Sequence, residues 1–166
     1  MMTFSLTQYW MVTMDSLRSW DEYIREDDPP FVDIEGTRLP MAFLRAVRME
    51  GWGKVGCREI LYENHNWHFA ESDDYPWGMD ALGHGLVPFR SIAIDRKVLE
   101  MGRLYLVREL WGLKLPDGTI HDGVVHACDT GGGIIGNHID WFIGSHDNIS
   151  PLGDLPMSCL LRGPIS

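Results

Sequence analysis

The sequence predicts a mostly β protein, built as a small closed β-barrel with one substantial helix and long loops. Short runs of β-branched and aromatic residues recur along the chain, and glycines and Asp-Gly pairs separate them. Only one stretch places its apolar residues at helical spacing. A chain of 166 residues suits one well-cored domain, so we expect a single domain over residues 1–166.

The first half of the chain supplies a long strand, a short strand and the helix. Thr3–Thr13 is apolar, aromatic and β-branched, which indicates a strand. The acidic stretch 15–30 reads as a solvated surface patch that ends in a double proline. Phe31–Ile34 predicts a short strand, and Leu39–Glu50 has the spacing of an amphipathic helix. In residues 51–69 apolar and polar residues alternate loosely, and glycines interrupt the pattern, so we expect strand and loop there.

The second half predicts mainly strands and turns. Residues 72–85 form a loop in this interpretation, because a proline and three glycines break any period. Two Asp-Gly pairs, at 117–118 and 122–123, predict hairpin or loop turns. The expected strands are Ser91–Asp95, Leu99–Val107 with a turn at Gly102, Val124–Cys128 and His138–Gly144.

Charge and cysteine content exclude several classes of function. A net charge of −10 with no cluster of Lys or Arg argues against binding to nucleic acid or to anionic membrane surfaces. No apolar run reaches about 18 residues, so we expect no membrane span. Three scattered cysteines suit neither a disulfide framework nor a zinc site, and His65 with His68 has no further ligand at a fixed spacing. We therefore expect no metal and no cofactor.

Two carboxylates bracket a glycine-rich turn in the stretch 127–145. Asp129 and Asp140 flank the run Gly131–Gly133, and the segments on both sides read as strands. Glycines let another chain or a sugar approach the backbone closely, since they carry no side chain. Paired carboxylates in different surroundings are what acid chemistry on a glycosidic bond requires. In the simpler alternative, one Asp caps the turn and the other is solvated on a strand.

The run DTGGGIIGNHID resembles the signature of the 3D domain, a family named for three aspartates and found in membrane-bound lytic transglycosylase A and its relatives. The first aspartate of that signature ends an upstream strand, and here RSIAID ends at Asp95. All three positions are thus filled in order, over about Leu86 to Gly144. Two positions depart from the family pattern: Ile135 stands where Lys is frequent, and Gly133 where Ala is frequent. A cationic contact to substrate is therefore expected to be missing.

The resemblance implies a six-stranded double-psi β-barrel and the cleavage of peptidoglycan between N-acetylmuramic acid and N-acetylglucosamine, which leaves 1,6-anhydromuramic ends. It implies that Asp140 is the catalytic acid and base, that Asp129 raises the pKa of Asp140, and that Asp95 is supportive. The backbone amides of Gly131, Gly132 and Gly133 are expected to form a donor nest. Further supporting residues are Asn137 and His138, and the expected substrate contacts are Tyr75, Trp77, Arg90 and Trp141.

Two further readings remain open at this stage. A barrel of expansin-like type would bind cell-wall glycan through Trp and Tyr without cleaving it, and an intracellular barrel would bind a protein partner. Intact carboxylates at positions 129 and 140 favour the enzyme. We expect a monomer that acts on a glycan. It would be periplasmic or extracellular if a signal has been removed, and otherwise cytoplasmic.

Overall fold

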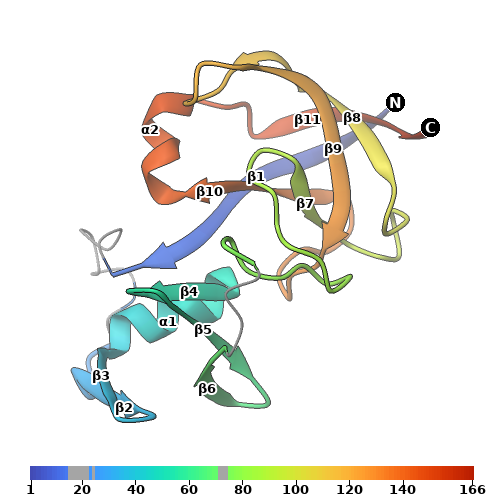
Figure 1. The fold of residues 1–166 in the computed structure, drawn as a ribbon. Helices are drawn as coiled ribbons and strands as arrows, with labels where there is room; N and C mark the ends of the chain where they lie inside the picture. Colours follow the sequence, from blue (N-terminus) through green and yellow to red (C-terminus); the bar gives the residue numbers. More distant parts are fainter. Residues whose placement is uncertain (15–22, 24, 71–74) are drawn as a thin grey trace. The chain divides into compact units, whose positions relative to one another are not determined.

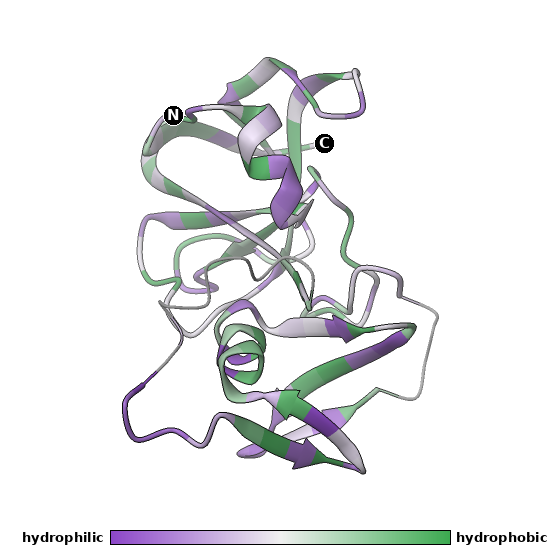
Figure 2. Ribbon diagram, turned by 90° about the vertical axis from the view of Figure 1, so that its left-hand side faces the viewer, coloured by the Kyte–Doolittle hydropathy of each residue, from purple (hydrophilic) through white to green (hydrophobic). Residues whose placement is uncertain are grey.

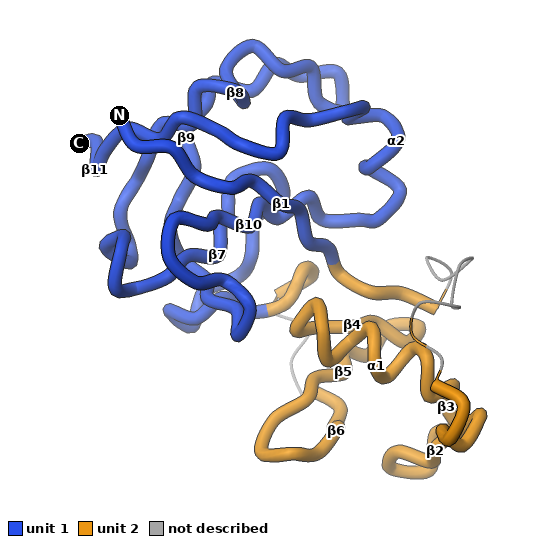
Figure 3. The backbone as a smooth tube through the Cα atoms, turned by 180° about the vertical axis from the view of Figure 1, so that it is seen from behind, with its two compact units in different colours: residues 1–10, 79–166 blue, residues 11–78 orange. Residues whose placement is uncertain are grey.

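The computed structural model describes residues 1–14, 23, 25–70 and 75–166. These residues form two compact units (Figure 3). Unit 1 combines Met1–Trp10 with Met79–Ser166, and unit 2 is Met11–Gly78. Hydrophobic and hydrophilic residues follow one another along the strands of both units (Figure 2), as half-buried strands require. The predicted mostly β class is confirmed, whereas the expectation of a single domain over residues 1–166 stays a prediction.

Unit 1 contains a closed barrel of six strands (Figure 1). The strand order is β10-β7-β9-β8-β11-β1, and a further pairing of β1 with β10 closes the ring. The closed barrel predicted from the sequence and the six strands implied by the resemblance are thus confirmed, and the double-psi connectivity stays a prediction. The strands are β1 (Met2–Thr13), β7 (Ser91–Ile94), β8 (Leu104–Lys114), β9 (Ile120–Asp129), β10 (His138–Ser145) and β11 (Ser158–Ile165).

Alternating side chains from these strands fill the barrel interior. In β9 and β11 every second residue is buried over much of the strand, as expected when one face of a strand points to a core. Strand β10 is buried on both faces from Trp141 to Ile143. After β10 the chain makes two short helical turns, η2 (His146–Asn148) and α2 (Ile149–Leu152), before it enters β11.

Unit 2 holds the one long helix of the described residues and two small antiparallel arrangements. The hairpin β2 (Phe31–Ile34) and β3 (Thr37–Pro40) precedes α1 (Met41–Glu50). The strands β4 (Trp52–Val55), β5 (Arg58–Glu63) and β6 (Asn66–Phe69) then pair in succession. The end of β1 joins this unit, where Val12 and Thr13 pair in parallel with β4.

The helix was predicted over Leu39–Glu50 and begins at Met41. Leu39 and Pro40 instead pair with Val32 and Phe31 in the β2–β3 hairpin, which holds their backbone extended. At the other end Gly51 adopts a positive φ of 95° and its amide donates to the Val47 carbonyl, so the helix ends where predicted.

One turn prediction is wrong. The pair at 122–123 lies inside β9, not in a hairpin or loop. Gly123 does adopt a positive φ of 78°, but the chain continues as a strand and the register between β8 and β9 shifts nearby. Gly123 therefore allows an irregularity in the pairing of β8 with β9. From the sequence alone, such a glycine cannot be distinguished from a glycine in a turn. The other pair, at 117–118, does lie in the turn between β8 and β9.

Two further expectations lie wholly or partly outside the described residues. The acidic patch falls mostly on 15–22 and 24, and the start of the loop predicted over 72–85 falls on 71–74. The rest of that loop contains turns and one isolated bridge between Met79 and Gly85, as predicted for a segment without regular structure. No helix among the described residues combines the length and the apolar composition needed to cross a bilayer.

Candidate active site

Asp129 and Asp140 lie on the two neighbours of a single strand. In the antiparallel pair β7–β10, Ala93 is the partner of Asp140, and in the parallel pair β7–β9 it is the partner of Asp129. Two strand spacings separate the backbones of the two acids, which is about 10 Å. The two aspartates thus flank the same point of β7.

The carboxylate of Asp140 belongs to a short polar chain. Thr7 donates its hydroxyl hydrogen to Oδ1 of Asp140 over 2.7 Å, and Nε2 of His138 lies 2.7 Å from the same hydroxyl oxygen. A hydroxyl carries one hydrogen, so when Thr7 donates to Asp140, it accepts from Nε2–H of His138. His138 and Asp140 are two residues apart on β10 and face the same side. His138 is thus connected to Asp140 through Thr7, and its supporting role stays a prediction.

The carboxylate of Asp129 accepts a hydrogen bond from the phenol of Tyr9 over 2.8 Å. Tyr9 is two residues from Thr7, so both side chains project from the same face of β1. The Tyr9 ring packs on Phe142 with 5.0 Å between the ring centroids. This packing buries the Tyr9 ring and holds its phenol beside Asp129.

Burial dominates the electrostatics of both acids. It raises the pKa of Asp140, and the nearby charge of Asp129 acts in the same direction, while the hydrogen bond from Thr7 opposes them. Burial also raises the pKa of Asp129, against the hydrogen bond from Tyr9. The phenol pKa of Tyr9 is raised well above 10 by burial and then by Asp129, so Tyr9 keeps its hydrogen and remains a donor. Both acids are thus easier to protonate than an aspartate in water.

Sequence analysis missed a third acid beside this pair. Asp80 is only 6% exposed, and its Oδ1 accepts hydrogen bonds from the amides of Leu82 and His84, both at 2.9 Å. Its negative charge contributes to the raised pKa of Asp129. Asp80 lies in the loop before β7, where the sequence pointed only to Tyr75 and Trp77 as substrate contacts. Its position in a local Asx-type turn was the one signal that could have indicated a fixed side chain.

Asp95 has a different environment from the other two signature aspartates. Its Oδ2 accepts from the amide of Gly136 at 2.8 Å, and its Oδ1 accepts from the amide of Lys97 at 2.9 Å. These bonds, that from Gly136 first, lower the pKa of Asp95. Asp95 thus anchors the far end of the glycine-rich turn, in line with the supportive role that the resemblance implies.

The left-handed residue of the glycine-rich turn is Gly136, with a φ of 68°, and not the triple glycine. Gly131, Gly132 and Gly133 are exposed, and a Cβ added at Gly132 or Gly133 would meet no atom within 4 Å. The donor nest expected from their amides stays a prediction. Asn137 is exposed, and its side chain donates to the Thr3 carbonyl over 3.3 Å, which ties the turn to β1.

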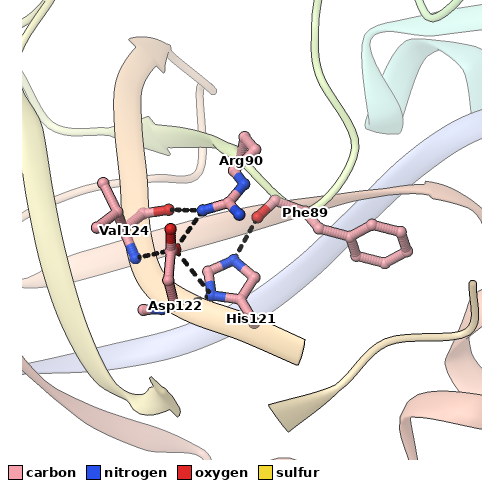
Figure 4. A network of polar contacts seen from close by, with 6 residues as sticks. Phe89, Arg90, His121, Asp122 and Val124 are labelled. Atoms are coloured by element: carbon pink, nitrogen blue, oxygen red, sulfur yellow. Dashed lines mark hydrogen bonds and ion pairs between the residues drawn. The ribbon is translucent and has the colours of Figure 1, made fainter. Parts of the chain in front are cut away.

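Arg90 belongs to a separate polar network (Figure 4). Its guanidinium pairs with Asp122 and donates to the Val124 carbonyl over 3.0 Å. His121 is buried, donates from Nε2 to the Phe89 carbonyl at 2.6 Å, and accepts at Nδ1 from the amide of Gly123. Burial lowers the pKa of His121, so the ring is kept neutral. The network ties the start of β7 to β9, and this contact occupies the arginine that we expected to bind substrate.

Trp141 does not fit the expected contact with substrate. Its exposed fraction is 0%, and its ring packs in the barrel core against Phe89 and His121. Residues 139, 141 and 143 share the inward face of β10, whereas Asp140 faces the other way. The indole therefore has no free face for a sugar ring, and we withdraw the expected substrate contact at this position.

Tyr75 and Trp77 are half-buried residues of unit 2, whereas the acids belong to unit 1. Their expected contact with the same substrate stays a prediction. Across the residues that the structure describes, no group of three or more His, Cys, Asp or Glu side chains is placed to hold a metal ion.

The comparisons with known proteins concern the fold and the signature region. The family model of the 3D domain matches residues 90–155. A membrane-bound lytic murein transglycosylase from Agrobacterium tumefaciens superposes with a TM-score of 0.56 at 14% identity, covering 96% of this chain and 72% of the other. Lytic transglycosylase MltA of E. coli with bound chitohexaose superposes with a TM-score of 0.57 at 14% identity, covering 96% and 71%. A search of curated proteins found no match. Residues 90–155 thus match the family model of the 3D domain, and the chain has a fold similar to that of the lytic transglycosylases.

Proposed function

We propose that this protein is a lytic transglycosylase-like enzyme that cleaves peptidoglycan between N-acetylmuramic acid and N-acetylglucosamine. The observation that carries the proposal is the half-buried Asp140, whose pKa is raised by burial and whose carboxylate is held by Thr7 at 2.7 Å. A carboxyl that stays protonated and fixed in direction is suited to protonating a leaving group.

One carboxyl can serve both halves of this reaction. Asp140 donates its proton to the oxygen of the glycosidic bond while the bond from C1 to that oxygen breaks. The C6 hydroxyl of the muramic residue then attacks C1, and its proton passes to the carboxylate of Asp140. The C1–O6 bond closes the 1,6-anhydro ring, and Asp140 is returned to its protonated form. Because no water is consumed, a second carboxylate to activate water is not needed.

The neighbours of Asp140 then have supporting roles. The negative charge of Asp129 makes ionisation of Asp140 less favourable, which favours the proton-donating form. Thr7 fixes the direction of the Asp140 carboxyl and connects it to His138. We propose the amides of the exposed triple glycine as donors to a sugar oxygen, and Tyr75 and Trp77 as the aromatic residues for sugar contacts.

The similar fold of MltA, which was solved with bound chitohexaose, supports a glycan as the ligand. Peptidoglycan lies outside the cytoplasmic membrane, so the proposed reaction requires the protein to work in the periplasm or outside the cell.

The test is digestion of purified peptidoglycan by the wild type and by Asp140→Asn, with mass analysis of the released fragments. We expect products that are lighter by one water than those of hydrolysis, from the wild type alone. Asp154→Asn is the matched control, because it makes the same change at an exposed aspartate of unit 1 and should leave the products unchanged. Equal release by wild type and Asp140→Asn would refute the assigned acid. Binding to the polymer without any release would instead identify a glycan-binding module of expansin-like type.

A further inference from the structure

A pocket of about 320 Å³ opens on the outer surface of the barrel at β8 and β11. It has no part in the chemistry proposed for Asp140. Its lining combines apolar side chains, one tryptophan and two arginines: Met1, Leu106, Arg108, Trp111, Leu160 and Arg162.

The register of β8 and β11 explains how these residues come together. Arg162 is the partner of Leu106 in the antiparallel pair, and Leu161 is the partner of Val107. Continued by one residue, the same register sets Leu160 opposite Arg108, so leucines and arginines alternate diagonally on one face. The leucines are half-buried and the arginines are exposed. The pocket thus has an apolar floor and a cationic rim.

The exposed side chains of this pocket are not explained by folding. Trp111 is 68% exposed, although indole is among the most costly side chains to leave in water. Within the described residues, neither Arg108 nor Arg162 has an acidic group within ion-pair distance. Glu109, the acid next to Arg108 in β8, accepts a hydrogen bond from the amide of Leu160 instead. Arg108 and Arg162 occupy diagonal positions on neighbouring strands, so their positive charges repel each other. They are close together although the protein as a whole has a net charge of −10.

We infer that this pocket is a second binding site, which takes a carboxylate-bearing segment of an acidic peptide. Arginine binds carboxylates with two parallel hydrogen bonds, and a carboxylate between Arg108 and Arg162 would relieve their repulsion. The face of Trp111 and the leucine floor would hold the apolar part of the same segment. The inference rests on the proposed function, because peptidoglycan carries acidic peptides on its glycan chains.

The pocket is separate from the proposed catalytic acid. Thr7, which holds Asp140, is six residues along from Met1, or about 20 Å in a strand. In the barrel order β8 stands three positions from β10 in either direction. One part of a polymer could therefore be held at the pocket while another part reaches Asp140, so we expect the site to increase retention on intact peptidoglycan and not to take part in bond cleavage.

The test measures binding of free peptide stems, released from peptidoglycan by an amidase, to the full chain carrying Asp140→Asn. Titration calorimetry gives the Kd, and quenching of Trp111 fluorescence reports on the site. We expect Trp111→Ala and Arg162→Gln each to weaken binding about tenfold, as expected for loss of one stacking or charge-assisted contact. Lys114→Gln removes a positive charge from β8 outside the pocket, and Met157→Ala removes an exposed apolar side chain. Both controls should bind like the parent protein.

Two results would overturn the inference: no binding of the peptide to the parent protein, or equal Kd values for the parent and both pocket variants. A second assay separates this inference from the proposed function. Glycan chains stripped of peptides should be cleaved equally by the wild type and by Trp111→Ala, whereas intact peptidoglycan should retain the variant less well. If the wild type cleaves neither substrate while the peptide still binds at Trp111, the proposed catalysis fails and the pocket remains.

Discussion

Replacing Thr7 by Val tests how Asp140 is held. The change keeps the shape of the side chain and removes the hydroxyl that contacts both Asp140 and His138 at 2.7 Å. A hydrogen bond to a charged group contributes about 1.5–3 kcal/mol. If the bond is needed in full in the transition state, kcat should fall roughly ten- to hundredfold, since each 1.4 kcal/mol is about a factor of ten. KM should change little, because Thr7 is assigned to the carboxyl and not to the sugar.

The same variant should also move the pH dependence of the reaction. The bond from Thr7 lowers the pKa of Asp140, so its loss raises that pKa further. An acid that must be protonated then stays active to higher pH, and the descending limb of the kcat/KM profile should move upward. Thr7→Ser keeps the hydroxyl, so its rate and the pH at which its kcat/KM profile falls should match those of the wild type.

The pKa of Asp140 can be followed without any substrate, by NMR titration of carbon-labelled aspartate carboxyls with Asp140→Asn used for assignment. We expect the resonance of Asp140 to titrate at higher pH in Thr7→Val than in the wild type. A lower or unchanged pKa, together with an unchanged rate, would refute the account of Thr7. A raised pKa without any cleavage in the wild type would leave the local electrostatics intact and remove the proposed enzyme.

Four further substitutions test the two units of the fold. Burial raises the pKa of Asp140 and Asp129 above 3.8, so the folded state loses stability as pH rises from 3.8 through the folded pKa. Asp140→Asn and Asp129→Asn should therefore each be more stable than the wild type to urea at pH 7, and not at pH 3. The pKa of Asp95 is lowered, so the opposite holds: ionised Asp95 stabilises the fold above pH 3.8, and this stabilisation is lost as pH falls through the folded pKa. Asp95→Asn should therefore lower Tm at pH 7, and the difference in Tm from the wild type should shrink on acidification. In unit 2, Gly53→Ala places a methyl 2.3 Å from Cγ2 of Val47 and should cost about 1–3 kcal/mol in urea unfolding, with Val47→Ala in the same chain recovering part of the loss.

The sequence was sufficient for the class of fold and for most strands, because alternation and turn residues are local signals. The strand at Phe31–Ile34 and the end of the helix at Glu50 agree with the structure. Where the predictions failed, the competing interaction was not local. The first two residues of the predicted helix are held in a hairpin, and the Asp-Gly pair at 122–123 is held in the ladder between β8 and β9.

The surroundings of the acids could not be predicted from the sequence. Thr7 and Tyr9 reach Asp140 and Asp129 across 133 and 120 residues of sequence, and no spacing rule connects them. They meet because the pairing of β1 with β10 closes the barrel. Trp141 illustrates the converse: an aromatic residue beside an acid suggested a sugar contact, but the alternation of β10 turns it into the core.

The hydrogen bonds at the two acids also indicate which of them holds the proton. Donors to a carboxylate favour its ionised form. The hydrogen bonds from the phenol of Tyr9 and the backbone of Thr130 act to lower the pKa of Asp129, against burial and the charge of Asp80. The hydroxyl of Thr7 and the charge of His138 act to lower the pKa of Asp140, against burial and the charge of Asp129. By hydrogen bonding alone Asp129 is the better stabilised anion, and its charge in turn makes ionisation of Asp140 less favourable. We therefore expect Asp140 to titrate at higher pH than Asp129. Tyr9→Phe should raise the pKa of Asp129 and so reduce the difference between the two pKa values. An NMR titration in which Asp129 holds its proton to higher pH than Asp140 would reverse the roles proposed for the pair.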